Sequence, residues 1–331
     1  MRYNWKDFCF LGLTLATNTA YIDRVQDPNP NQDRIFRSQF GISWFVCEDV
    51  WMMLNGHRPN SKREPKHLLW ALLFMKVYGN ESTCCRLVGT SIKTYRKWVW
   101  EVLDAVADLK AMVVSAWEFQ LVETNSIQDF ILTFFPFFYK IVWENRKNSD
   151  IGNDCLVSVD GVNFEIEEPY PYEREWSRRW FSPKFKGPGL RYEVGLTILT
   201  GDIVWVNGPF ACGLWSDWKI FSEAGMKDHL DENEKVEADN GYAHGNPEYV
   251  KSRSGIFYGN GSIRNTVRAR HETVNKRLKQ FSILSSKFRH GVLKHRVVFD
   301  SIAVVTQLSF NRGESLFQID ETEYDDDHED N

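Results

Sequence analysis

The sequence predicts an α+β, or mixed α/β, protein in which an all-helical front half precedes a mixed β-sheet flanked by helices. Apolar residues recur at spacings of three and four between residues 68 and 103, which is the period of a helix. Three short strand-like runs, two of them rich in β-branched residues, follow between residues 155 and 207, and a short strand and a long basic helix come after residue 235. The order strand, hairpin, helix, strand, helix is typical of a mixed sheet covered by helices.

The length of 331 residues allows about two domains. Segments 22–39 and 55–65 are rich in Asn, Pro, Asp and Arg, which favour turns, so we expect them to be linkers. The predicted division is a partly irregular N-terminal extension at 1–63, a helical domain at 64–150, a sheet-containing domain at 151–310 and an acidic disordered tail at 311–331. Helices that brace the two halves are expected between 105 and 145.

Charge and cysteine content exclude several classes of protein. The net charge is −5, but residues 320–331 hold eight acids and no Lys or Arg, so the remaining chain is close to neutral. The acidic run is expected to be a solvated, unfolded tail, with a DNA mimic that shields a basic groove as the alternative. The six cysteines form no CxxC pair and no histidine pair has HxxxH spacing, which disfavours a zinc module or zinc hydrolase. No apolar run is long enough to span a membrane, so we expect an intracellular protein in a reducing compartment, without membrane contact.

The front half has the outline of a helix-turn-helix. A helix is expected after Pro65, a second at 81–87, a turn at Gly89 and a third helix capped by Ser91. On this third helix one face is apolar, formed by Ile92, Tyr95, Val99, Val102 and Leu103. The opposite side carries Lys93, Thr94 and Lys97. Such a helix can lie in a DNA major groove, whereas the alternative is an ordinary three-helix unit with a solvated basic face.

Three carboxylates are candidates for a metal site. Asp160 and Asp239 each end a short predicted strand, and Glu272 lies on the predicted helix at 264–280. Each also has an ordinary explanation, since Asp160 and Asp239 stand in turn-forming sequences and Glu272 could pair with Lys276. However, residues 263–296 hold ten Lys or Arg and Glu272 as their single acid. An acid among phosphate-seeking cations favours a nuclease site, because Mg²⁺ prefers oxygen ligands and two ions about 4 Å apart can activate phosphodiester cleavage.

The segments LVSVDG, VEADNGYAHG and RNTVRARHETVNKRLKQFSIL resemble the three signature blocks of the PIF/Harbinger-type DDE superfamily transposases. The resemblance covers about residues 155–310 and implies an RNase H-like DDE endonuclease domain. It implies that Asp160, Asp239 and Glu272 are the catalytic and metal-binding triad, holding two Mg²⁺ or Mn²⁺ ions, with Asp160 bridging both. Asp217, in GLWSDWKIF, is similar to a further recurrent acid of the family.

The implied activity is cleavage of DNA phosphodiesters by metal-activated water, followed by strand transfer from the freed 3′-hydroxyl. We expect phosphates to be held by four cations of the basic helix, namely Arg268, Arg270, Lys276 and Lys279, and other DNA contacts to come from Lys93, Thr94 and Lys97. The resemblance implies a nuclear setting and a Myb-like DNA-binding partner protein, with a homo-oligomer left open. The alternatives are a domesticated, catalytically silent DNA- or protein-binding derivative and a structure-specific nuclease without a role in transposition.

Overall fold

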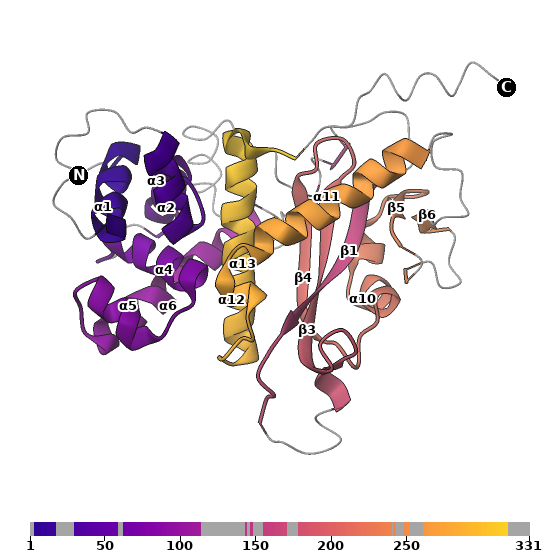
Figure 1. The fold of residues 1–331 in the computed structure, drawn as a ribbon. Coiled ribbons are helices and arrows are strands. Elements are labelled where there is room, and N and C mark those ends of the chain that lie inside the picture. The colour runs from indigo at the N-terminus through magenta and orange to yellow at the C-terminus, as the bar shows by residue number, and fades with distance from the viewer. Residues whose placement is uncertain are drawn as a thin grey trace.

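The computed structural model describes residues 3–17, 30–58, 62–113, 143, 146–147, 155–170, 178–239, 241–242, 248–251 and 261–316. A helical N-terminal region is followed by a mixed sheet with flanking helices, which confirms the predicted α+β architecture at this level (Figure 1). No helix within the described ranges is both long and apolar enough to cross a membrane.

The first sixty residues are more helical than their composition suggests. The helices of the N-terminal region are α1 (Trp5–Thr17), α2 (Pro30–Phe40), α3 (Trp44–His57), α4 (Pro65–Val77), α5 (Glu81–Leu87), α6 (Ile92–Asp108) and α7 (Lys110–Val113). The extension, expected to be partly irregular, thus contains three helices, and the predicted linker 22–39 is wrong for residues 30–39, which lie in α2. Its polar sequence still folds as a helix because Phe36 and Phe40, four residues apart, are both buried in the core.

The predicted helix-turn-helix outline is present in α4, α5 and α6. Gly89 has a φ of 67°, a left-handed conformation that suits glycine in a turn. The Ser91 side chain then accepts a hydrogen bond from the backbone N–H of Thr94 at 3.1 Å and caps α6. Lys93 and Lys97 are exposed, as expected. Ile92, expected on the apolar face, is instead 44% exposed.

The sheet has the strand order β2-β3-β1-β5-β6, with β4 paired to β3. Its strands are β1 (Cys155–Glu165), β2 (Phe181–Ser182), β3 (Gly187–Thr197), β4 (Ile203–Ala211), β5 (Lys235–Glu237) and β6 (Val250–Lys251). β1, β3 and β4 are antiparallel neighbours, whereas β5 runs parallel to β1 and β6 runs parallel to β5. The flanking helical elements are α10 (Asp217–Glu223), η5 (Met226–His229), α11 (Gly261–Lys279), α12 (Ser282–Ser285), α13 (Val292–Ser309) and η6 (Phe310–Glu314).

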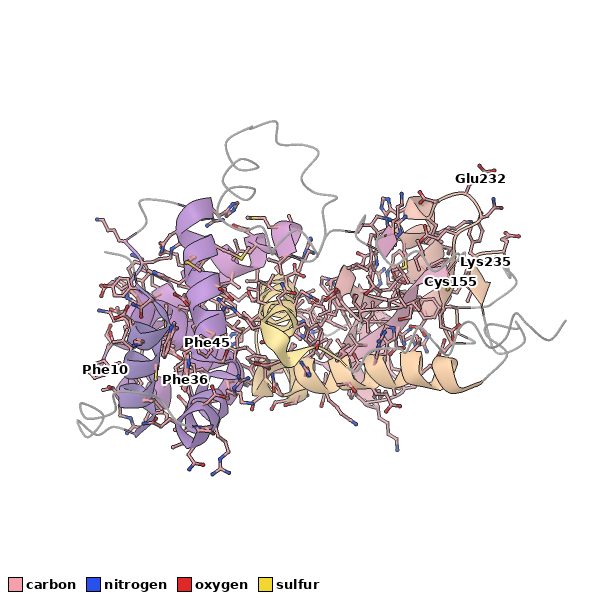
Figure 2. The ribbon with its side chains drawn as sticks, turned by 90° about the horizontal axis from the view of Figure 1, so that it is seen from above. Phe10, Phe36, Phe45, Cys155, Glu232 and Lys235 are labelled. Carbon is pink, nitrogen blue, oxygen red and sulfur yellow. The ribbon has the colours of Figure 1, made fainter. Side chains whose placement is uncertain are left out.

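Helix α13 joins the two halves of the molecule. It stands between the N-terminal helices and the sheet, while α11 crosses the sheet beside it (Figure 1). Toward the helices, the Ser301 hydroxyl donates to the carbonyl of Leu103 at 2.9 Å, and toward the sheet, the Gln307 side chain accepts from the N–H of Ile203 at 2.7 Å. The view from above shows Phe36 and Phe45 on one side of this helix and Cys155 on the other (Figure 2).

One cluster of buried apolar side chains accordingly runs from the N-terminal helices through α13 into β1, β3 and β4. A smaller cluster under the other side of the sheet includes Trp143, Val157 and Phe221. The helical and sheet regions thus share a core. The division predicted at residue 150 separates two chain segments and not two independent hydrophobic interiors.

The chain end also differs from the prediction. Arg312 forms a salt bridge with Asp49, Glu314 contacts Arg37, and Leu316 is buried, so residues 311–316 are packed against the fold. A tail beginning at 311 is therefore wrong, because these side chains have partners in the N-terminal helices and the core. Residues 317–331 lie outside the described residues, as do 114–142 of the predicted bracing helices.

Candidate metal-binding site

Asp160 lies within a continuous strand and not in a turn. β1 runs through Asp160 and Gly161, and Asp160 pairs with Val194 of β3 in regular antiparallel register. The alternative that the Asp-Gly sequence forms a hairpin turn is therefore wrong. Its strand neighbours fix the backbone of this acid in the middle of the sheet.

The charge on Asp160 is poorly solvated. Burial raises the pKa of its carboxyl group, and the nearby Asp239 carboxylate raises it further. The Gly161 backbone N–H, the Asn275 side chain, whose Nδ2 donates to Oδ2 at 3.2 Å, and Lys184 act in the opposite direction. Because desolvation is the largest of these effects, a cation bound beside Asp160 would stabilise its charged form.

Asp239 lies two residues after Glu237 of β5, which pairs in parallel with Ser158 of β1, so Asp239 lies beside Asp160. It is exposed, and its Oδ1 accepts a hydrogen bond from the N–H of Gly241 at 2.7 Å, so it also has the turn-forming role that its sequence suggested. A side-chain Cβ at Gly241 would lie 2.9 Å from Oδ1 of Asp239 and 3.3 Å from Oδ2 of Asp217. Two carboxylates therefore face the same glycine.

Glu272 lies on the exposed side of α11, and within the described chain it makes no ion pair with Lys276. All three predicted carboxylates line one pocket of about 410 Å³. The pocket is lined by Ser158, Val159, Asp160, Glu237, Ala238, Asp239, Val267, Arg268, Ala269, His271 and Glu272. The three acids thus line one pocket, but Asp160 comes from the middle of β1 and not from a strand end, so that part of the sequence prediction is wrong.

The carboxylates surround the pocket without closing on a single point. Among the described residues, no three His, Cys, Asp or Glu side chains lie close enough together to hold a metal ion as they stand. The donor set is nevertheless made of carboxylate oxygens, which are the ligands that Mg²⁺ and Mn²⁺ prefer. Asp160 is half-buried, Asp239 and Glu272 are exposed, and all three present carboxylate oxygens to the pocket, so the residues fit a divalent ion in chemistry.

Asp217 brings a further carboxylate beside the pocket. It lies in the first turn of α10, where its Oδ1 pairs with Arg191 at 3.1 Å. Burial raises its pKa, Arg191 lowers it, and Asp239 and Asp160 raise it, so the three aspartates share one electrostatic environment. The Asp217 side chain also lies close to β1, at Gly161. Residue 161 has to be small, because a Cβ there would overlap with Oδ1 of Asp217.

We therefore expect Gly161→Ala to destabilise the protein by about 1–3 kcal/mol, the usual range for overpacking in a close-packed site. Urea-induced unfolding would measure this change. Gly187→Ala is the matched control, because a Cβ at Gly187 meets no atom closer than 3.9 Å, and it should change stability by less than about 0.5 kcal/mol. Equal effects of the two variants would contradict the packing of Asp217 against Gly161.

Two polar groups lie buried beneath Asp217. Glu193 of β3 pairs with Gly161, and its Oε2 accepts a hydrogen bond from the indole N–H of Trp205 at 2.9 Å. Its Oε1 and the hydroxyl of Tyr242 find no hydrogen-bond partner among the described residues. Burial raises the pKa of Glu193 to about 8, with Asp217 as a further cause. Glu193 could not be identified from the sequence, because nothing in a strand-like run shows that an acid will face a closed interior.

The raised pKa of Glu193 predicts a specific pH dependence of stability. The folded protein binds a proton on Glu193 up to about pH 8, whereas the unfolded chain releases it near its ordinary value of about 4.5. Wild-type stability should therefore fall as pH rises from about 5 to 8, relative to Glu193→Gln, which retains an acceptor for Trp205. Thermal unfolding of both proteins across this range should show a difference in melting temperature that widens as pH rises. A difference that stays constant would contradict the raised pKa of Glu193.

The cations of α11 divide into two groups. Arg268 lines the pocket, and Lys276 is exposed. Burial lowers the pKa of Lys279, and the charge of Lys184 lowers it further, whereas the charge of Asp160 raises it. Lys279 and Lys184 therefore both lie near Asp160. Arg268, Lys279 and Lys184 are therefore in position to meet an anion at the pocket. Lys184, on the turn between β2 and β3, was missed from the sequence because it is far from α11 in the chain.

Arg270 and His271 are structural instead. Arg270 is 1% exposed, and its guanidinium donates to the carbonyls of Ile198 and, at 2.7 Å, Leu199. The prediction that Arg270 holds phosphate is therefore wrong, because these bonds fasten α11 to the turn after β3. The pKa of His271 is lowered to about 4, mainly by burial, and its Nε2 lies 2.8 Å from Ser158 Oγ, so the neutral ring links α11 to β1.

Comparisons of the chain with known protein families, with curated proteins and with solved structures find no match.

Proposed function

We propose that the protein is a divalent-metal-dependent DNA endonuclease of the DDE transposase type. The observation that carries the proposal is the single pocket lined by Asp160, Asp239 and Glu272, which come from three separate elements of the sheet region. The resemblance in sequence falls on the same three residues. An antiparallel β1, β3, β4 unit continued by parallel β5 and β6 supports an RNase H-like fold for this region.

Each side chain has a role that follows from its surroundings. The half-buried Asp160 would gain most from a bound cation, since its charged form is the least solvated of the three predicted acids. Asp239 and Glu272, both exposed, would complete the binding of Mg²⁺ or Mn²⁺. Bound ions would supply activation of the attacking oxygen and stabilisation of the leaving one.

Substrate binding would depend on cations around the pocket. Arg268 at the pocket wall, Lys276 on the exposed side of α11 and Lys279 near Asp160 would bind phosphates of the DNA backbone. Their positive charge would bring a DNA strand to the acids and hold it there. Strand transfer by the freed 3′-hydroxyl, a nuclear setting and a Myb-like partner protein belong to the same proposal and follow from the sequence resemblance.

A second candidate is a catalytically silent derivative that binds DNA or protein through the same surface. It is favoured by one observation: the acids among the described residues are not gathered into a ready-made metal cluster. Under this alternative the carboxylates would remain apart when divalent ions are added.

The test is a nicking assay with the purified full-length protein and supercoiled plasmid DNA, containing Mg²⁺, Mn²⁺ or EDTA. The endonuclease proposal expects nicked circles with either ion and none with EDTA. Thermal unfolding with and without Mn²⁺ provides a second readout, because an ion that binds only the folded state raises the melting temperature. Absence of nicking with both ions, together with an unchanged melting temperature, would favour the silent derivative.

A further inference from the structure

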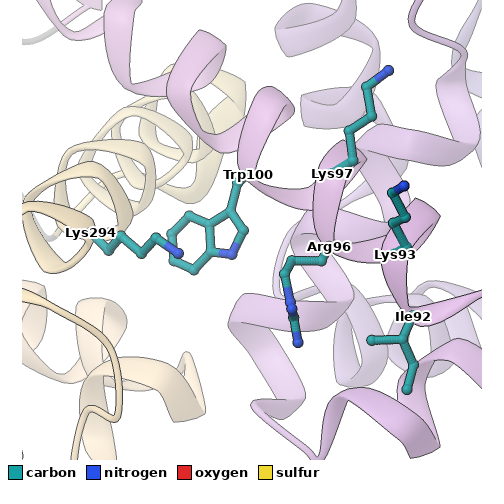
Figure 3. A pocket seen from close by; sticks show the side chains of 6 residues that line it. All are labelled: Ile92, Lys93, Arg96, Lys97, Trp100 and Lys294. Atoms are coloured by element: carbon teal, nitrogen blue, oxygen red, sulfur yellow. The ribbon is translucent and has the colours of Figure 1, made fainter.

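A second pocket lies between α6 and α13, away from the carboxylates. Its volume is about 570 Å³, and it is lined by Ile92, Lys93, Arg96, Lys97, Trp100 and Lys294. We call this surface the α6–α13 groove. Figure 3 shows Lys294 reaching from α13 toward Trp100, while the other cations project from α6. Four of its six lining residues are cationic, and they come from both halves of the chain.

Lys294 is held in a defined place. Its ammonium nitrogen lies 4.3 Å from the centre of the Trp100 ring, a cation–π contact. Trp100 packs edge-on against His290 and Phe74, with ring centres 5.3 and 5.6 Å apart, so the ring that carries the ammonium is itself fixed. The lysine charge is thereby fixed on the groove wall instead of moving freely in solvent.

The positive charge of the groove exceeds the negative charge beside it. Arg96 is paired with the carboxylate of Glu81, which lowers the pKa of that acid, and Lys294 contributes to the same lowering. Within the described chain, Lys93, Lys97 and Lys294 form no ion pair with any carboxylate. The capped N-terminal end of α6 adds a partial positive charge next to Lys93. Three lysines thus remain available for an anionic ligand.

We propose that the α6–α13 groove binds the phosphate backbone of duplex DNA. This inference rests on the proposed function for the choice of DNA, and it assigns Arg96, Trp100 and Lys294 to the contact in addition to the cations of α6 foreseen from the sequence. Base stacking is disfavoured because the Trp100 ring already carries Lys294 and packs against two other rings. Separate lysines on two helices suit successive phosphates, and the exposed Ile92 can contact deoxyribose.

The groove would also set the position of DNA relative to the acid pocket. Helix α13 packs on α6 and on the sheet that carries Asp160, and the core is continuous between them. A duplex bound to Lys294 would therefore be attached to the same rigid element that supports the sheet. This arrangement lets the helical region and the sheet region contact one DNA molecule together.

The test measures duplex binding by fluorescence anisotropy over a series of KCl concentrations, in EDTA, with full-length protein carrying Asp160→Asn so that no cleavage occurs. Each lost phosphate contact should reduce the slope of log affinity against log salt concentration by about 0.9. We expect this for Lys294→Gln, and about twice this for Lys93→Gln combined with Lys97→Gln. Lys294→Arg should retain the slope.

Lys6→Gln is the matched control, because Lys6 is an exposed lysine lying 5.4 Å from the ring of Trp5 in the same helical region. Slopes of Lys294→Gln and Lys6→Gln that agree would overturn the inference, as would tighter binding of a single strand than of the duplex. Thermal unfolding of each variant verifies that it is folded. Since the assay involves neither metal nor cleavage, loss of the slope effect and loss of nicking are separate results, and either proposal can fail alone.

Discussion

Asp160→Asn should abolish metal-dependent nicking and, at neutral pH, make the folded protein more stable. Removing the half-buried member of the metal-binding set is expected to lower the cleavage rate by about 10³-fold or more, which corresponds to roughly 4 kcal/mol of activation free energy. The stability gain follows from linkage, because the folded protein raises the pKa of Asp160. At pH values above the pKa of Asp160 in the unfolded chain, folding therefore costs free energy because the charged carboxylate loses solvation. Asn carries no charge and avoids this cost.

The assay is the plasmid nicking reaction, followed over time for the wild type and each variant, with urea unfolding measured in parallel. Glu272→Gln should also lose nicking, without the stability gain, because Glu272 is exposed. Glu232→Gln is the matched control, since Glu232 is an exposed acid that does not line the pocket, and it should leave the rate unchanged. An active Asp160→Asn protein would refute the catalytic assignment.

Arg146→Ala should be among the most destabilising single substitutions, costing about 3–5 kcal/mol. The Arg146 side chain is fully buried and forms two hydrogen bonds with Glu234, at 2.8 and 2.9 Å, while its guanidinium lies 4.1 Å from the ring centre of Trp143. Removing the arginine would leave the buried Glu234 carboxylate without its main counter-charge. Glu234 directly precedes β5, the strand that leads to Asp239, so nicking should weaken together with stability.

Chemical unfolding would measure the loss, with two variants as controls. Arg146→Met combined with Glu234→Leu removes both charges and should recover much of the stability, because an apolar pair of similar size needs no desolvation of ions. Lys147→Ala affects an exposed pair with Asp231, at 2.9 Å, and should cost less than about 1 kcal/mol. A cost for Arg146→Ala as small as that for Lys147→Ala would contradict the buried-pair assignment.

Features that depend on neighbours in the chain were predictable from the sequence. The bounds of α5 and the cap of α6 follow from Glu81, Gly89 and Ser91, whose preferences act within a few residues. The meeting of Asp160 and Asp239 was predicted from two short strands that each end in an acid, but only Asp239 follows the end of its strand. Asp160 lies within β1, and the two acids are neighbours because Ser158 pairs in parallel with Glu237.

Features that depend on distant contacts were not predictable. Residues 298 to 309 of α13 are all buried, so this helix has no apolar stripe to reveal its orientation. Arg270 carries the same charge as Arg268 two residues earlier, yet only Arg270 meets carbonyls of the turn after β3. The polar segment that forms α2 is likewise helical because of two aromatic side chains that reach a core contributed by other helices.

The placement of α13 has a consequence for how the molecule unfolds. A fragment that began at Cys155 would contain α13 without the N-terminal helices. Apolar side chains of α13 such as Phe299 and Ile302 would then lose part of their packing and become exposed to water. The N-terminal helices alone would be left with an equally bare surface. Neither piece keeps a complete interior, so denaturation should be a single concerted transition from one end of the chain to the other, despite a length at which separable folding units are common.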